Sequence, residues 1–219
     1  MTQNKLHLAL FDGSLRPPSF VFRLAEALAQ LHNVYLLGFS GIPRKSTAPI
    51  HYLNCGSADR PFRLLLTSIR WALQAFIQKG KIQPLAQVLS KSFKKDLKGL
   101  QRQNLKWALT LTNPDLIHVQ WPSLLPWCEP YLESGEFLMV LSQRGYQTNV
   151  RPWMSPENLR YLQQWYPKID GFHSVSKAIS KVGNRISSIV MFTSTLGGGG
   201  ACCSHAVKTR ARLIRETVV

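Results

Sequence analysis

Acidic residues are scarce in this sequence. The 219 residues include 11 Asp and Glu against 27 Lys and Arg, which gives a formal net charge of +16. An excess of one sign carries no information about the fold, but it favours an anionic partner. Nucleic acid, an anionic membrane surface and a phosphorylated substrate are the three classes of partner that fit.

Cysteine and long apolar runs are also scarce, and each absence removes a class of protein. The cysteines show no CxxC spacing and two of them are adjacent, so neither a zinc framework nor a redox motif is expected at Cys55, Cys128, Cys202 and Cys203. The apolar run Leu6–Phe11 is too short for a signal peptide. The most apolar helical stretch, Phe62–Ile77, is shorter than the roughly 20 apolar residues of a membrane-spanning helix. We expect a cytoplasmic protein.

Apolar runs and helical periodicities alternate along the first 186 residues. Short runs typical of buried strands cover Leu6–Phe11, Asn33–Phe39, Ile50–Leu53, Asp115–Gln120, Phe137–Ser142 and Gly171–Val175. Helices are expected at Ser19–Leu31, with Ser19 as the cap, and at Phe62–Ile77, Pro84–Leu111, Pro122–Leu132, Pro156–Trp165 and Ser176–Arg185. Residues 143–156 are expected to form a polar loop. The pattern predicts one α/β domain, residues 1–186, with a doubly wound, mostly parallel, Rossmann-like sheet.

The predicted helix Pro84–Leu111 is amphipathic and basic. Five apolar side chains lie on one side, and the opposite side carries Lys91, Lys94, Lys95, Lys98 and Arg102. The region Arg60–Lys106 holds eleven basic residues and one acid, a net charge of +10. Two interpretations are about equally supported: reversible contact with the inner face of an anionic membrane, and a solvated helix face.

The pattern ends near Ser187. Residues 187–219 contain four consecutive glycines, two adjacent cysteines and a basic end, without a sustained period of 2 or 3.6. One interpretation is a flexible tail, and the other is the product of a truncated or frameshifted coding sequence. We favour the second, and expect 187–219 not to be a folded domain.

Four segments in order resemble the N-terminal half of the group 1 glycosyltransferases, which are retaining enzymes of the GT-B fold. These segments are FDGS at 11–14 with PPSFV at 17–21, PDLIHVQW at 114–121, VLSQRGY at 140–146 and DGFHSVSKA at 170–178. The resemblance implies two doubly wound domains facing each other across a cleft, with the nucleotide sugar held mainly by the C-terminal domain. That second domain carries two glutamates in an E-x7-E pair, which this sequence lacks. The donor-binding domain is therefore expected to be missing.

The residues that could bind substrate follow the predicted strands, because ligands bind at the carboxyl ends of strands in a doubly wound sheet. They are Gly13, Ser14, Gln120, Trp121, Arg144, Gly145 and Ser176. Gly13 is more often a simple turn, Trp121 more often a core residue and Ser176 first a helix cap. Arg144 stands where the family has a histidine or an arginine before glycine, and would offer a forked donor to a phosphate or an acidic acceptor. His118 is expected to be a packed strand residue, and His173 is assigned no metal role because no ligand lies at suitable spacing.

The resemblance implies sugar transfer from a UDP- or GDP-sugar to a glycan or lipid-linked acceptor, as in polysaccharide biosynthesis. This chain is expected to be inactive without the donor-binding domain, to bind no cofactor alone and to hold no metal. Two alternatives stay open: a basic non-enzymatic module for nucleic acid or anionic membrane, and a single-domain transferase. Nucleic acid is the weaker partner because no recognised reader motif is present.

Overall fold

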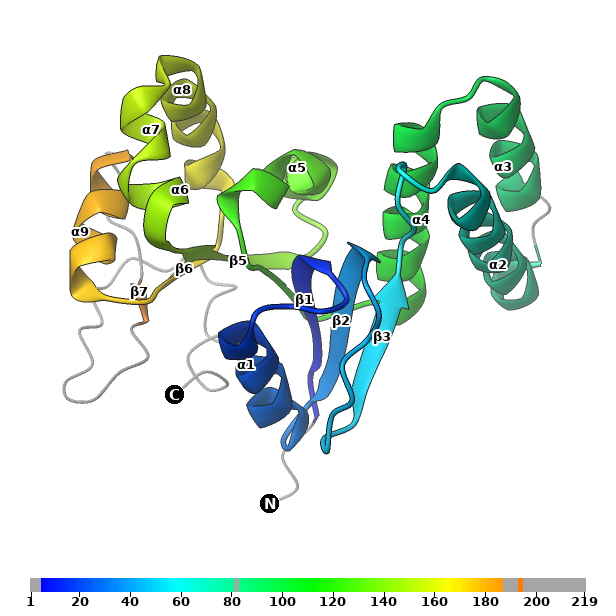
Figure 1. The fold of residues 1–219 in the computed structure, drawn as a ribbon, viewed down its shortest axis with the longest axis horizontal. Helices are drawn as coiled ribbons and strands as arrows, with labels where there is room; N and C mark the ends of the chain where they lie inside the picture. The colour runs from blue at the N-terminus through cyan, green and yellow to red at the C-terminus, as the bar shows by residue number, and fades with distance from the viewer. Residues whose placement is uncertain (1–4, 81–82, 187–192, 195–219) are drawn as a thin grey trace. The chain divides into compact units, whose positions relative to one another are not determined.

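The computed structural model describes residues 5–80, 83–186 and 193–194. The chain divides into two compact units, residues 1–115 and 116–219 (Figure 1). The predicted boundary at residue 186 stays a prediction. The predicted tail, residues 187–219, lies outside the described residues except for 193–194.

The first unit has three parallel strands in the order β3-β2-β1. These are β1 (His7–Ser14), β2 (Asn33–Ser40) and β3 (Ile50–Asn54). The β1–β2 register runs regularly from His7 opposite Asn33 to Phe11 opposite Leu37, and then shifts at Gly13. Gly38 permits this close approach, since a Cβ there would lie 2.5 Å from the carbonyl carbon of Ser14.

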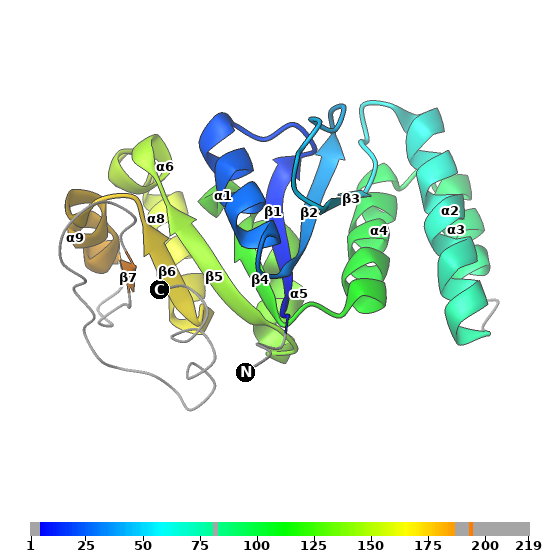
Figure 2. The same ribbon diagram turned by 90° about the horizontal axis from the view of Figure 1, so that it is seen from below.

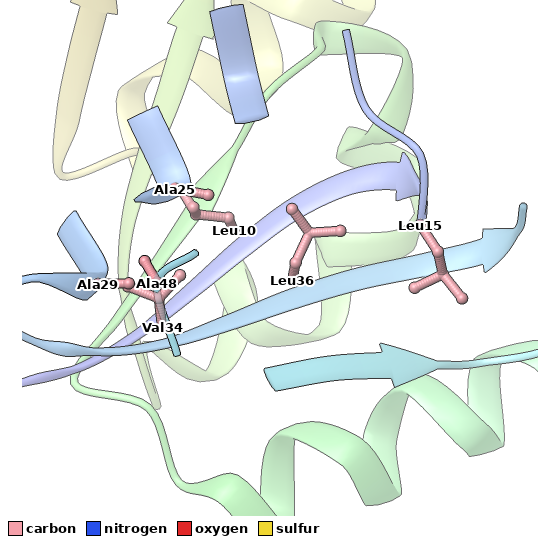
Figure 3. Close-up of a cluster of buried hydrophobic side chains, with 7 residues drawn as sticks. All are labelled: Leu10, Leu15, Ala25, Ala29, Val34, Leu36 and Ala48. Carbon is pink, nitrogen blue, oxygen red and sulfur yellow. The ribbon is translucent and has the colours of Figure 1, made fainter. Parts of the chain in front are cut away.

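Helix α1 (Ser19–Ala29) covers one face of β1 and β2. Figure 3 shows its Ala25 and Ala29 against the strand residues, in a cluster of buried side chains made of Leu10, Leu15, Ala25, Ala29, Val34, Leu36 and Ala48. Small residues on the helix and branched ones on the strands let the two elements pack closely. The predicted cap is wrong: Ser19 is the first helical residue, Pro18 precedes it, and no side chain caps this helix.

Three further helices complete this unit: α2 (Pro61–Lys79), α3 (Gln83–Phe93) and α4 (Leu97–Thr112). Figures 1 and 2 show α2 and α3 side by side. Helix α4 is fixed to the segment that follows β3, because Gln101 and Asn104 donate hydrogen bonds to the carbonyl oxygens of Gly56 and Cys55 at 2.8 and 2.9 Å. Trp71 of α2 likewise donates to the Asn54 carbonyl at 2.8 Å.

The single long helix predicted over Pro84–Leu111 is wrong. It is interrupted between Phe93 and Leu97, where Lys95 has a left-handed φ of 52°. The Asp96 carboxylate accepts a hydrogen bond from the Gly99 N–H at 2.8 Å and so caps a new helix, α4. The five predicted basic residues therefore belong to two helices and their junction, and they do not form one continuous helical face.

The second unit has four parallel strands in the order β4-β5-β6-β7. They are β4 (Leu116–Val119), β5 (Leu138–Gln143), β6 (Gly171–Ser174) and the two-residue β7 (Thr193–Ser194), which was not predicted. The helical elements are η1 (Pro122–Leu124), α5 (Leu125–Ser134), α6 (Gly145–Asn149), α7 (Arg151–Met154), α8 (Pro156–Trp165), η2 (Tyr166–Lys168) and α9 (Lys177–Ile186).

The polar loop predicted over residues 143–156 is wrong, because α6 and α7 occupy most of it. Pro152 lies in the first turn of α7, where a missing N–H costs nothing. The α/β class is confirmed: parallel strands alternate with flanking helices in the Rossmann-like, doubly wound manner. Among the described helices, none combines the length and the apolar content that a bilayer crossing requires.

Candidate functional site

Polar side chains gather on one face of β4, β5 and β6 at their carboxyl ends. In the β5–β6 register Ser142 lies opposite His173, and in the β4–β5 register Val119 lies opposite Leu141. One step further along β4, Gln120 comes opposite Ser142. Because side chains alternate between faces, His118 and Gln120 share a face with Ser142, Arg144 and His173. These five residues are here called the strand-end cluster.

Ser142 is the centre of the strand-end cluster. Its Oγ lies 2.9 Å from Nε2 of His118 and 3.2 Å from Nδ1 of His173. Nη2 of Arg144 donates to the same Oγ at 3.4 Å and to Oε1 of Gln120 at 3.2 Å. Ser142 and Gln120 are fully buried, so these contacts replace the hydrogen bonds that water would make.

The single hydroxyl proton of Ser142 limits the tautomers of the two histidines. If Ser142 donates to His118, then Nδ1 of His173 carries a proton and donates to Ser142, which leaves Nε2 of His173 as a bare acceptor. If Ser142 donates to His173, then His118 donates to Ser142, and Nε2 of His173 carries the proton. A third acceptor within reach of the Ser142 hydroxyl is Oε1 of Gln120 at 3.5 Å, in which case both histidines donate to Ser142. Each arrangement keeps both imidazoles neutral.

Both histidines are held in the neutral form. Burial lowers the pKa of His118 well below its usual value of 6.5, and repulsion from His173, when that ring is protonated, and from Arg144 lowers it further. Burial also lowers the pKa of His173, to about 4, and Arg144 adds to the effect. The two rings lie edge to face with centroids 5.4 Å apart. At neutral pH the strand-end cluster therefore combines one permanent cation with two neutral imidazoles.

His173 offers an unused hydrogen-bonding atom. Its side chain is 5% exposed, and Nε2 has no hydrogen-bond partner among the described residues. A buried polar nitrogen without a partner costs free energy, so the position suits a hydroxyl or a water molecule. A ligand hydroxyl could fill it as donor or as acceptor, depending on the tautomer.

Arg144 is the member of the strand-end cluster that is only half-buried. Its backbone N–H donates to Oγ1 of Thr148 at 3.1 Å, and this bond fixes the turn between β5 and α6. Its guanidinium is positioned by the hydrogen bonds that Nη2 donates to two neutral groups, Gln120 and Ser142. A guanidinium positioned in this way presents a planar set of donors to an anion or to sugar hydroxyls.

A second polar layer supports the opposite face of the same strands. Ser174 donates to Oε1 of Gln143 at 2.6 Å, and both side chains are fully buried. Gly183 of α9 packs against this amide, since a Cβ there would lie 2.3 Å from Nε2 of Gln143. The strand ends that carry the cluster are thus fixed from both faces.

The structure brings together two of the predicted substrate-binding residues, Gln120 and Arg144. Trp121 is the second residue after β4 and is half-buried, whereas a core residue would be fully buried. Gly145 starts α6 with a left-handed φ of 39° and is exposed. The cap predicted at Ser176 is confirmed: its Oγ accepts a hydrogen bond from the Ile179 N–H at 3.2 Å.

The other predicted site residues lie in the first unit. Gly13 and Ser14 are the last two residues of β1: Gly13 has a left-handed φ of 83° where the β1–β2 register shifts, and Oγ of Ser14 accepts a hydrogen bond from the Arg16 N–H at 3.1 Å. Of the five predicted basic residues, Lys91 forms an ion pair with Asp96 at 3.6 Å. Lys94, Lys95, Lys98 and Arg102 have exposed side chains.

Sequence reasoning missed the functional potential of His118, Ser142 and His173. His118 is a buried strand residue as expected, but it also belongs to a hydrogen-bonded network. No histidine lies near His173 in the sequence, yet the fold places the ring of His118 beside it. The two are brought together by strand register rather than by sequence spacing. No group of three or more His, Cys, Asp or Glu that could hold a metal occurs within the described ranges.

Comparison with models of known protein families and with curated proteins finds no match to this sequence.

Proposed function

We propose that this chain is the acceptor-side domain of a GT-B glycosyltransferase. It would act with a donor-binding domain that supplies a UDP- or GDP-sugar, and would present a glycan or lipid-linked acceptor for transfer. The α/β class supports this proposal, as do the four motif segments in their order. The observation that carries it is the half-buried side chain of Arg144, held at the carboxyl end of β5 in the same cluster as His173, whose buried Nε2 has no hydrogen-bond partner among the described residues.

The chemistry of these two residues suits a hydroxyl-rich ligand that bears negative charge. Arg144 keeps its charge at every physiological pH and would bind a phosphate or carboxylate through paired N–H donors. The neutral His173 would bind an adjacent hydroxyl through Nε2. Since Arg144 keeps its proton, a residue of this kind would orient and stabilise a ligand and would not take a proton from it.

Saturation-transfer NMR of the purified chain tests the proposal. The probes are neutral oligosaccharides and oligosaccharides that bear phosphate or uronic acid, each at millimolar concentration. We expect saturation transfer to the charged saccharides, whose binding Arg144→Gln should weaken at least about tenfold, since hydrogen bonds to a charged group contribute about 1.5–3 kcal/mol. Arg151→Gln, at an exposed arginine of α7, is the matched control.

Two results would contradict the proposal. One is the absence of transfer to every saccharide, and the other is equal binding by the Arg144→Gln and Arg151→Gln variants with native circular dichroism. Turnover of a nucleotide sugar by the purified chain alone, lost on Arg144→Ala, would instead indicate a single-domain transferase.

The charge of the first unit supports a second candidate function, a basic non-enzymatic module for nucleic acid. Exposed basic side chains at Lys94, Lys95, Lys98 and Arg102 favour this alternative. An electrophoretic mobility shift that weakens steeply with salt is expected if it holds. Absence of a shift at low salt removes it.

A further inference from the structure

Helix α2 exposes a continuous apolar stripe along its whole length. Six large apolar side chains between 37 and 78% exposed form this stripe, here called the α2 stripe: Phe62, Leu66, Ile69, Leu73, Phe76 and Ile77. From Phe62 to Phe76 the spacing alternates between four and three residues, and Ile77 follows Leu73 by four, which places all six on one side of the helix. The opposite side is buried, with Leu64, Trp71, Ala72 and Ala75 packed inward. The α2 stripe therefore lies on the exposed side of the helix, opposite the side that packs inward.

The flank of the α2 stripe is basic. Arg63 and Arg70 are two turns apart, both exposed, and lie on one side of the stripe at about 100° per residue. The 19-residue helix contains no Asp or Glu. The wider region Arg60–Lys106 has a net charge of +10. An apolar stripe with cationic flanks is typical of helices that lie in the plane of a membrane surface.

We infer that α2 docks on an anionic lipid bilayer, with the α2 stripe among the acyl chains and Arg63 and Arg70 at the headgroups. The length of α2 corresponds to about 28 Å at 1.5 Å per residue, so several headgroups lie within reach of its two arginines. This inference stands on the first unit alone and does not depend on the proposed glycosyltransferase function.

The charge distinguishes a membrane from other occupants of this face. If a second copy of the chain docked on this face, two regions of charge +10 would lie against each other. Their repulsion opposes self-association. Nucleic acid would attract the arginines but would leave the six apolar side chains in water. An anionic bilayer is complementary to both the charged and the apolar part.

Vesicle co-sedimentation of the full chain tests this inference. The vesicles are phosphatidylcholine alone, or phosphatidylcholine with about a quarter phosphatidylglycerol as the anionic lipid. We expect binding to the anionic vesicles and at least tenfold weaker binding to the neutral ones. Leu73→Glu should weaken binding to anionic vesicles more than tenfold, and Arg63→Gln should weaken it about fivefold, to these vesicles only.

Ile42→Glu is the matched control for Leu73→Glu. It makes the same change of charge and polarity at a residue that is 81% exposed in the segment between β2 and β3. Equal binding by the wild type and Leu73→Glu, or equal loss in Leu73→Glu and Ile42→Glu, would overturn the inference. A wild-type dimer in sedimentation velocity that Leu73→Glu converts to monomer, without vesicle binding, would assign the α2 stripe to a second copy instead.

Discussion

Acidification should destabilise the second unit through His173, because its imidazole is buried in the neutral form. Its folded-state pKa of about 4 lies below the value of 6.5 of an unperturbed histidine. Between these two values the unfolded chain binds a proton that the folded chain excludes, so stability falls as the pH falls. The contribution of His173 is present in full above about pH 6.5 and is lost as the pH approaches about 4.

The size of this effect follows from the two pKa values. Each pH unit within the window corresponds to about 1.4 kcal/mol for one proton. Between about pH 7.5 and about pH 4.5 the loss attributable to His173 is roughly 2.5 kcal/mol. His118 should add to the acid sensitivity in the same direction, since burial lowers its pKa as well.

A double difference cancels the contributions of the titrating groups that do not interact with His173. His173→Asn keeps a side-chain amide near the position of Nδ1, so that Ser142 retains a partner, but this amide does not titrate. The free energy of unfolding is measured by urea titration for wild type and variant at both pH values. We expect the wild type to lose roughly 2.5 kcal/mol more than His173→Asn over this range.

His51→Asn, at an exposed histidine of β3, controls for the removal of an imidazole. If wild type and His173→Asn lose the same stability to within about 0.5 kcal/mol, the burial of a neutral His173 is refuted.

Substitutions at three further positions test the packing and the helix capping of the first unit, each by the free energy of unfolding in urea. Gly38→Ala should destabilise by about 3 kcal/mol, the upper end for overpacking, because the new Cβ would meet the backbone of Ser14, which cannot rotate away. Asp96→Ala should cost about 1 kcal/mol by removing the cap on the Gly99 N–H, whereas Asp96→Asn should cost only a few tenths because asparagine caps equally well. Leu36→Ala should cost about 2–5 kcal/mol, since this side chain is fully buried in the cluster under α1; a cost below about 1 kcal/mol would contradict that packing.

The strands and most helices could be predicted from the sequence because their signals are local. Pro156 in the first turn and Ser155 before it mark the start of α8, and the Ser155 Oγ caps that helix. The short apolar runs of β4, β5 and β6 lie within one or two residues of the predicted ranges. Parallel strands that are buried on both faces consist of continuous apolar runs, and the sequence shows such runs at these strands.

The break between α3 and α4 was missed because apolar periodicity continues through it. Leu89, Phe93, Leu97 and Leu100 have the spacing of one helical face, so the pattern alone favours an unbroken helix. The competing signal was Asp96, three residues before Gly99, in the position of a cap. A single cap residue within an apolar period is a weak signal until the structure shows that the backbone turns there.

The strand-end cluster could be predicted only in part. Gln120 and Arg144 follow strands directly, and such positions mark the edge where parallel sheets bind ligands. His118, Ser142 and His173 lie within or at the ends of the strands, and they meet only because Ser142 falls opposite His173 in the β5–β6 register. Sequence gives the alternation of faces along each strand, but register between strands that are about 30 residues apart depends on tertiary packing.

The burial of Ser142 determines which atoms of the cluster can meet a ligand. A hydroxyl between two imidazoles could suggest a nucleophile, but Ser142 is fully buried and its proton and lone pairs are used by His118, His173 and Arg144. A reacting carbonyl or phosphorus atom would have to displace this network to reach Oγ. Arg144, by contrast, is only half-buried as a residue. Under the proposed function Ser142 is therefore a positioning residue, and the ligand would be recognised by the cation that Ser142 holds in place.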